Sequence, residues 1–291
     1  MTIEVLRGVL AGSILSGTSL LYAALGELVG EKAGVVNLGV EGVMLTGASV
    51  AAAIAWLTGN PYLGVLAAAL AGSAINLLFA YVAVGRRANQ LAAGLALMFL
   101  GMGASALIGQ PFVGASIAGL PKLGRGGDLL VYLALPTAAL IWGLLFRTRW
   151  GLGLRAVGEN PQAAFAAGRR LERLRYQALL LAGALGGVGG AHLAVALTLG
   201  WTEGMTAGRG FIAIALVIFA NWNPLWLVAG ALLFGAAETL ELALQAQGVD
   251  ISPFLMSMIP YLLTLVVLPL WIWRGRSAAP AALGRTYRGA E

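Results

Sequence analysis

Cysteine is absent from all 291 residues, and histidine occurs once, at position 192. The lack of cysteine excludes disulfides, thiolate metal sites and cysteine nucleophiles. One imidazole makes neither a metal site nor a proton relay by itself, so we expect His192 to be structural. Charged residues are also scarce, at 10% of the chain, whereas hydrophobic residues make up 59% and the mean hydropathy is +0.87. This composition excludes a soluble globular domain and predicts a polytopic membrane protein.

Lysine occurs only at Lys32 and Lys122, and neither residue follows a glycine or precedes Ser or Thr. The phosphate-binding motif GxxxxGK[ST] is therefore absent, which excludes an ATP-binding subunit. Paired histidines, a serine–lysine dyad and an aspartate pair are absent too, which argues against a membrane-embedded enzyme. We expect no catalytic residue, no metal site and no cofactor on this chain.

Nine apolar segments approach the length of about 20 residues that a membrane-spanning helix needs. The second is interrupted by the polar run NLGVEG and the seventh is short. The 42 glycines predict helices that pack closely through small residues. We expect an all-α bundle of about eight to ten spans in one domain, 1–276, and a flexible cytoplasmic tail, 277–291. The segments are 9–28, 35–57, 63–84, 91–109, 129–146, 176–199, 211–220, 225–245 and 254–273.

The basic residues predict the orientation in the membrane. If the C-terminus is cytoplasmic, all of the 18 Lys and Arg residues except Arg7, Lys122, Arg125 and Arg209 lie on the cytoplasmic side. This asymmetry predicts an odd number of spans with the N-terminus outside. It also accounts for the net charge of +6, so we expect membrane lipid and no nucleic acid as a partner.

Segment 147–175 is a polar, arginine-rich loop between two apolar segments, and the charge rule places it in the cytoplasm. Within it, GENPQAAFAAG has the signals of a short helix: Asn160 as the cap, Pro161 in the first turn and Gly168 as the stop. A compact helix presented to the cytoplasm between two spans predicts a docking element for a partner.

The run GELVGEKAGVVNLGVEGVMLTGA concentrates Glu27, Glu31, Lys32, Asn37 and Glu41 among glycines. Non-helical backbone at membrane depth is tolerated only where protein or a water-filled cavity satisfies it. We interpret the run as a broken or re-entrant helix, with an ordinary interfacial loop as the alternative for its first part. Asn37 and Glu41 lie further into the apolar run, and a structural hydrogen-bond role and a pathway role both stay open for them.

Other polar residues in the spans have two readings as well. Asn76, Asn89 and Gln90 could bond sugar hydroxyls or base edges, or could hold helices together. Counting along the helices at about 1.5 Å per residue puts His192 and Glu238 at similar depths, so we expect them to approach each other or to share a water. The tryptophans near segment ends indicate interfacial belts more than stacking platforms for a base.

Four blocks carry a family resemblance, in order: GELVGEKAGVVNLGVEGVMLTGA, GRRANQLAAGLAL, GLRAVGENPQAAFAAG and GFIAIALVIFANWNPLWLVAGALLFGAAETLELALQ. Together they resemble the permease subunit of ABC importers of the simple-sugar and nucleoside branch, nearest to bacterial nucleoside uptake permeases. The chain departs from that pattern at Lys32, where we expect arginine, and at NWNP, where a glycine commonly follows the phenylalanine. Neither departure changes the assignment.

The resemblance implies a permease in the cell membrane that pairs with a second, homologous permease subunit, a heterodimer being favoured. It also implies a separate ATPase that uses ATP and Mg, and an extracellular substrate-binding lipoprotein. The implied coupling helix, which sits in a groove of the ATPase, comprises Arg155, Gly158, Glu159, Asn160, Pro161 and Ala164. The candidate pathway residues are Asn37, Glu41, Asn89, Gln90 and Glu238.

A stand-alone secondary transporter or channel for a small polar solute is the alternative. Such a carrier needs no partner and usually places a coupling carboxylate at mid-depth, a role open to Glu41 or Glu238. An ATPase that copurifies through residues 155–168 separates the importer subunit from the carrier.

Overall fold

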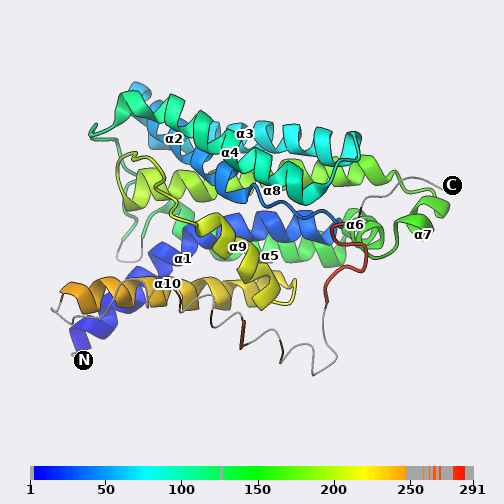
Figure 1. Ribbon diagram of the computed structural model, residues 1–291. Coiled ribbons are helices and arrows are strands. Elements are labelled where there is room, and N and C mark those ends of the chain that lie inside the picture. Colours follow the sequence, from blue (N-terminus) through cyan, green and yellow to red (C-terminus); the bar gives the residue numbers. More distant parts are fainter. Residues whose placement is uncertain are drawn as a thin grey trace.

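The computed structural model describes residues 3–124, 127–246 and 278–285, together with the isolated positions 258, 262, 265, 266 and 269. Within these residues the regular structure is helical, apart from one isolated β-bridge between Val113 and Trp201. Seven of these helices are long and apolar enough to cross a membrane. The long helices run alongside one another, and two short helices project from one end of the bundle (Figure 1). The predicted all-α polytopic bundle is confirmed.

Turns of irregular helix extend three of the long helices. A π-helical turn, Tyr81–Gly85, follows α3, and another, Leu193–Leu197, follows α8, while a 3-10 turn, Gln110–Phe112, follows α4. In chain order the α-helices are α1 (Ile3–Lys32), α2 (Val40–Thr58), α3 (Pro61–Ala80), α4 (Gln90–Gly109), α5 (Leu129–Arg147), α6 (Arg149–Glu159), α7 (Pro161–Ala166), α8 (Leu171–His192), α9 (Arg209–Phe219) and α10 (Pro224–Ala246).

Seven of the nine predicted segments correspond to the seven long helices. The seventh segment, 211–220, corresponds to α9, whose 11 residues are too few to span a membrane. The ninth, 254–273, lies outside the described residues except for the five isolated positions. A span there stays a prediction.

Local sequence signals set most of the helix starts. The Asn60 side chain accepts hydrogen bonds from the backbone N–H of Tyr62 and Leu63, and Pro61 occupies the first turn of α3. Side chains also cap α4, α5, α6 and α7 in this way; the capping residues are Asn89, Asp128, Thr148 and Asn160. These polar residues satisfy N–H groups that would otherwise have no partner at a helix start.

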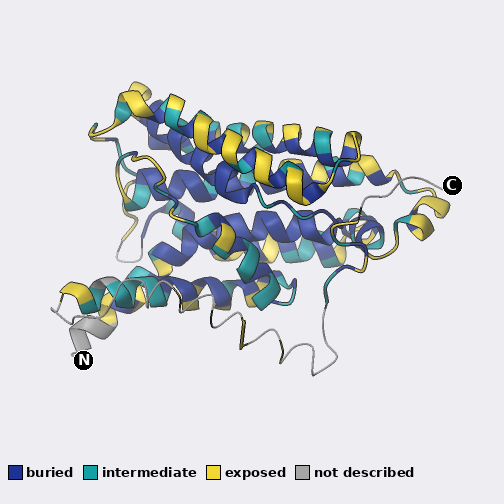
Figure 2. Ribbon diagram, in the orientation of Figure 1, coloured by how far each residue is buried: buried dark blue, intermediate teal, exposed yellow. Residues whose placement is uncertain are grey.

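Glycine brings α1, α2, α3 and α8 into backbone contact. A Cβ on Gly47 of α2 would lie 2.6 Å from the Cα of Gly187 in α8. A Cβ on Gly189 would lie 2.7 Å from the carbonyl oxygen of Ser19 in α1, and one on Gly187 would overlap that of Ala68 in α3. The predicted packing through small residues is therefore confirmed. Figure 2 shows the result: α1, α2 and α8 are largely buried, whereas α3 and α4 expose one face.

Candidate functional site

The predicted short helix in segment 147–175 is confirmed as α7. Asn160 Oδ1 accepts the backbone N–H of Ala163 at 3.0 Å, Pro161 is the first residue, and Gly168 follows the helix with φ +76°. The sequence analysis missed α6, which fills the preceding 11 residues and begins at the Thr148 cap. The arginine-rich segment is therefore a two-helix element, α6–α7, that projects beside the ends of the long helices (Figure 1).

The end of α6 lies directly against residues 33–39, the non-helical connection between α1 and α2 that we call the break. A Cβ on Gly158 would overlap the carbonyl oxygen of Lys32 and would lie 3.2 Å from the Gly34 nitrogen. Gly34 itself has φ +81°, in the left-handed region that favours glycine. A movement of α6 therefore reaches the break through backbone contact, without an intervening side chain.

The other predicted coupling residues divide into packed and exposed ones. Arg155 donates from Nε to the carbonyl oxygen of Leu145 at 3.1 Å, and its guanidinium lies 4.9 Å from the centre of the Phe146 ring. Ala164, in α7, is buried, whereas Glu159 and Asn160 are exposed. Arg155 thus holds α6 against the end of α5, and Glu159 and Asn160 lie at the surface.

Residues 278–285 form a turn that is packed against this end of the bundle, which corrects the prediction of a flexible tail for the described part of 277–291. Ala282 is 5% exposed and donates its N–H to the carbonyl oxygen of Gly158 at 2.9 Å. Further hydrogen bonds join the 278–285 segment to α1, the break, α4, α6 and the α9–α10 connection; their partners there are Lys32, Gly34, Gln90, Glu159 and Asn221. The segment thus ties α6 to the ends of the inner helices.

The break returns into the bundle before α2 begins. The Asn37 N–H donates to Glu27 Oε1 at 3.0 Å, so Asn37 lies level with a residue five positions before the end of α1, about 8 Å from that end. Most of the break is buried. The predicted broken helix is therefore located as a non-helical connection, and α2 starts inside the bundle.

Asn37 holds the break through side-chain hydrogen bonds. Its Nδ2 donates to Asn76 Oδ1 at 2.8 Å, and Asn76 Nδ2 donates to the carbonyl oxygen of Leu179 at 2.6 Å. A closed cavity of about 10 Å³ adjoins Glu27, Asn37 and Asn76, which is at the lower limit for one water molecule. The polar centre is closed in this structure.

The Glu41 carboxylate accepts hydrogen bonds at the start of α9. Its Oε1 accepts the Thr206 hydroxyl at 2.5 Å and the Gly208 N–H at 2.8 Å, and its Oε2 accepts the Gly210 N–H at 2.6 Å. A carboxylate at a helix N-terminus is stabilised by the helix dipole and by these unpaired N–H groups. The structure thus gives Glu41 the hydrogen-bond partners that its burial requires.

Glu238 also has partners, and they do not include His192. Glu238 Oε1 accepts from Arg209 Nη2 at 2.6 Å, its Oε2 accepts the Ser16 hydroxyl, and Arg209 Nη1 donates to Ser19 Oγ at 2.9 Å. Arg209 begins α9, so this network fixes the start of that helix against α1. At its other end, α9 stops shortly before Trp222, whose Nε1 donates to the Glu31 carboxylate.

His192 pairs instead with Asp128, which the sequence analysis did not consider. His192 Nε2 lies 3.2 Å from Asp128 Oδ2, and both residues are buried. The Asp128 carboxylate also accepts the N–H groups of Leu130 and Val131 at the start of α5. Burial by itself would raise the pKa of Asp128, but the bonds from His192 and the two N–H groups outweigh it and hold the pKa below its ordinary value. The expected approach of His192 and Glu238 is not seen, because each side chain has other partners.

Asn89 and Gln90 stand at the start of α4, at the α6–α7 end of the bundle. Asn89 is exposed and caps α4 through the Ala92 N–H at 3.0 Å. Gln90 is buried, and its Oε1 accepts the Val36 N–H of the break at 3.0 Å. The five candidate pathway residues do not converge on one cavity. Asn37 and Glu41 lie at the buried start of α2, Gln90 contacts the break at Val36, and Glu238 and Asn89 lie elsewhere.

The bundle and its buried polar centre define a multi-pass membrane protein with two helices, α2 and α9, that begin inside it. Residues 9–268 match the family described as "branched-chain amino acid transport system / permease component". The chain belongs to this family, and it is a permease subunit of an ABC transporter.

Relatives match it over nearly their whole length. The chain is 36% identical to the putative glucose ABC transporter permease protein TsgC13 of Haloferax volcanii, over 96% of this chain and 97% of that protein. It is 34% identical to the guanosine ABC transporter permease protein NupQ of Bacillus subtilis and 32% identical to the nucleoside ABC transporter permease protein NupC of Lactococcus lactis, in each case over 98% of both chains. No solved structure gives a significant match.

Proposed function

We propose that this chain forms half of the translocation pathway of an ATP-driven importer for a nucleoside or a related sugar-containing solute. A separate ATPase subunit hydrolyses ATP with Mg, and this chain is non-catalytic. The α6–α7 element and the 278–285 segment face the cytoplasm. A second, homologous permease subunit completes the pathway, and an extracellular lipoprotein delivers the solute. Near-full-length similarity to nucleoside and sugar permeases supports the substrate class.

The observation that carries the coupling role is the backbone contact between α6 and the break at Gly158. An ATPase seated on the exposed face of α7 moves α6, and α6 moves the break because no flexible side chain lies between them. The break holds Asn37 beside the closed cavity at the start of α2. Its displacement opens the polar centre to one side of the membrane, a rigid-body rearrangement of packed helices.

Reconstitution tests the proposal. The chain is placed in vesicles with its sibling permease, the ATPase and the binding protein, and uptake of radiolabelled guanosine is measured with and without ATP. The expected result is accumulation that needs both ATP and the ATPase. Accumulation by this chain alone, driven by an ion gradient and indifferent to ATP, contradicts the proposal and establishes the secondary-transporter alternative.

A pair of glycine variants tests the coupling path. Gly158→Val fills the contact with Lys32 and Gly34, whereas Gly143→Val in α5 adds a side chain where nothing lies within 4 Å of the Cβ position. We expect Gly158→Val to lower transport at least about tenfold while the ATPase still copurifies, since overpacking between backbones displaces one element from the other. Gly143→Val should transport normally. Equal transport by the two variants contradicts this coupling path.

A further inference from the structure

The short helix α9 bridges the two helices that the break connects. At its start the backbone N–H groups of Gly208 and Gly210 donate to Glu41 of α2. Just past its end, Trp222 Nε1 donates to Glu31 of α1. Glu31 and Glu41 are 2% and 7% exposed, and the 11 residues of α9 have a length of about 16 Å. The helix thus joins the buried carboxylates on either side of the break and lies alongside it.

Charged groups fix the start of α9. Arg209, its first residue, donates to Glu238 of α10 at 2.6 Å and to Ser19 of α1 at 2.9 Å. The Glu41 carboxylate accepts the Thr206 hydroxyl and two glycine N–H groups. Hydrogen bonds to ionised groups are the stronger ones, and these bonds join the start of α9 to three different helices. The start of α9 is therefore suited to be a pivot.

The residues that follow α9 have a strained backbone. Asn221 has φ +50° and Trp222 has φ +54°, in the left-handed region that is unfavourable for a bulky side chain. Such strain persists only where surrounding contacts impose it, and it is concentrated in switch regions. Trp222 is 7% exposed, and its ring is held by the hydrogen bond to Glu31. Loss of this bond lets the backbone relax, so the strain favours release of the end of α9.

Between its ends α9 is less buried than its neighbour α2. Four of its 11 residues are buried, namely Gly210, Ala213, Leu216 and Val217, whereas 14 of the 19 residues of α2 are buried. A segment with few buried contacts opens locally at a lower free energy than a packed one. The hydrogen bonds at its two ends therefore matter more for the position of α9 than its sides do.

The 278–285 segment joins the end of α9 to the α6–α7 element. Asn221 Oδ1 accepts the Ala278 N–H at 2.8 Å, and the Ala282 N–H donates to the carbonyl oxygen of Gly158 at 2.9 Å. Lys32, the last residue of α1, donates from Nζ to the carbonyl oxygen of Ala278 at 2.9 Å. A displacement of α6 therefore reaches the end of α9 and the end of α1 through one segment.

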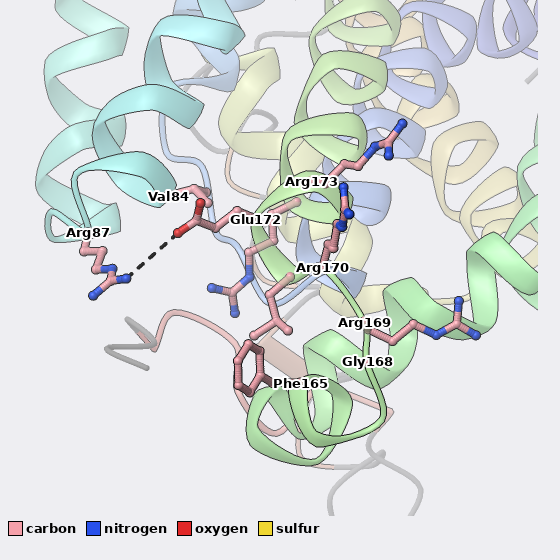
Figure 3. Close-up of a pocket in the computed structure, with 10 residues that line it drawn as sticks. Val84, Arg87, Phe165, Gly168, Arg169, Arg170, Glu172 and Arg173 are labelled. Atoms are coloured by element: carbon pink, nitrogen blue, oxygen red, sulfur yellow. Dashed lines mark ion pairs between the residues drawn. The ribbon is translucent and has the colours of Figure 1, made fainter. Parts of the chain in front are cut away.

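The α6–α7 element has room to move toward the end of α3. A cavity of about 710 Å³ lies there, and Val84 in the turn after α3 and Phe165 of α7 line it from opposite sides (Figure 3). At this cavity Arg87 Nη2 lies 4.0 Å from Glu172 Oε1, and both side chains are at least half exposed, so this ion pair is weak. Movement of α7 into this space displaces no packed core.

We propose that α9 is a gate of the translocation pathway at the α6–α7 end, and that the hydrogen bond between Trp222 and Glu31 is its latch. The helix pivots on its start. Movement of α6 displaces the 278–285 segment, the latch opens, and the end of α9 swings away from α1 beside the break. The latch is closed in this structure. This inference rests on the proposed function, because a gate requires a transported solute.

Thiol labelling tests the latch, because the chain has no cysteine of its own. Val217→Cys places a thiol on the buried face of α9 toward its end, and Gln162→Cys, on exposed α7, marks the face that carries the α6–α7 element. Reaction with an impermeant maleimide is measured in right-side-out and inside-out vesicles that hold the assembled transporter, and the labelled chain is resolved on a denaturing gel.

With the latch intact, Val217→Cys should react slowly from either face, since Val217 is 0% exposed. Trp222→Phe removes the Nε1 donor and keeps an aromatic ring. It should raise the rate at Val217→Cys at least about tenfold, the effect of losing one hydrogen bond to a charged group. The rise should occur from the face at which Gln162→Cys reacts. A rise from the opposite face overturns the proposal.

Trp201→Phe is the matched control. Trp201 is also buried, at 2% exposed, but its Nε1 donates to Ser105 Oγ of α4 at 3.3 Å and not to a carboxylate beside the break. It should change the rate at Val217→Cys less than about twofold, as expected for independent sites. Equal rates in Trp222→Phe and Trp201→Phe overturn the proposal.

A second thiol position separates a pivoting helix from a general loosening. Ala213 is also 0% exposed but lies nearer the pivot, so Trp222→Phe should raise the rate at Ala213→Cys less than at Val217→Cys. An equal rise at the two positions overturns the proposal. If Val217→Cys fails to fold, Ala220→Cys replaces it, because Ala220 is 0% exposed and nearer the latch.

Nucleotide separates this inference from the proposed function. ATP with vanadate should change the rate at Val217→Cys at least about fivefold, the lower end of a typical coupling between two sites. No change with nucleotide, while guanosine uptake needs ATP, overturns the gate and leaves the importer in place. A rise in Trp222→Phe together with uptake that is indifferent to ATP contradicts the importer and leaves the gate to a carrier.

Discussion

The inner helices α1, α2 and α8 differ from the outer helices α3, α4, α5 and α10 in nearly every physical property. Between 67% and 78% of each inner span is buried, against 22% to 33% of each outer span. The inner group carries the break, Glu27, Asn37 and Glu41, whereas the outer group presents leucine and phenylalanine to its surroundings. The comparison teaches that the inner helices carry the buried polar groups around the break, while the outer helices present apolar faces.

The largest effect should come from filling the backbone contact between the inner helix α8 and its neighbour α3. Gly187→Leu places a side chain against Ala68 and Gly72, whereas Gly103→Leu in α4 meets nothing within 4 Å. Overpacking typically costs about 1–3 kcal/mol, and more where backbone lies on both sides. We expect Gly187→Leu to give no monodisperse protein on size-exclusion chromatography in detergent. Gly103→Leu should behave as wild type, and equal yields would show that inner and outer glycines are equivalent.

Loss of the Glu41 carboxylate should have the next largest effect. Glu41→Ala leaves the N–H groups of Gly208 and Gly210 and the Thr206 hydroxyl without their acceptor. An unsatisfied buried group costs roughly 1–3 kcal/mol, so we expect thermal unfolding in detergent to occur well below the wild-type temperature. Glu203→Ala, in the exposed part of the same connection, is the control and should unfold with the wild type.

Removal of the 278–285 segment should have a moderate effect. A chain that stops after residue 277 loses the hydrogen bonds to α6 and to the inner helices, each with a net contribution of about 0.5–1.5 kcal/mol. We expect a lower unfolding temperature and ATP hydrolysis that no longer responds to substrate. A chain that stops after residue 285 keeps these bonds and should be unaffected. Identical behaviour of the two truncations contradicts the tie between α6 and the inner helices.

The smallest effect should be the acid sensitivity of the pair between Asp128 and His192. Because the pKa of Asp128 is lowered in the folded protein, the charged carboxylate stabilises the fold above its ordinary pKa. That contribution is lost as the pH falls through the lowered value, below about 4. Unfolding temperatures measured between pH 6 and pH 3 should fall less steeply for Asp128→Asn than for wild type. Parallel curves contradict this assignment.

Local signals were enough to predict α7, because a cap, a proline and a stop glycine act within a few residues of one another. The same reasoning missed α6, whose glycines at 151, 153 and 158 resemble a loop in the sequence. Gly151 and Gly158 instead allow close approach to the backbone of α5 and of α1. A one-dimensional pattern does not distinguish glycine used for a turn from glycine used for contact.

The remaining differences concern partners far apart in the chain. Residues 278–285 belong to a tail of small and basic residues whose composition predicts disorder, but their order comes from groups more than 50 residues away. Counting residues along helices did not predict the partners of His192 and Glu238, because such a count carries no information on the direction of a side chain around the helix axis. The break was predicted because buried charge among glycines is costly wherever it occurs, and this inference needs no knowledge of the partners.

The 278–285 segment also sets the order in which the protein can be completed. It leaves the ribosome after every helix from α1 to α10, yet its hydrogen bonds secure α6 beside Gly34. A nascent chain can therefore insert its spans before α6 is held in place beside the break. In the proposed coupling, an ATPase can therefore meet a secured α6–α7 element only after translation has passed residue 285.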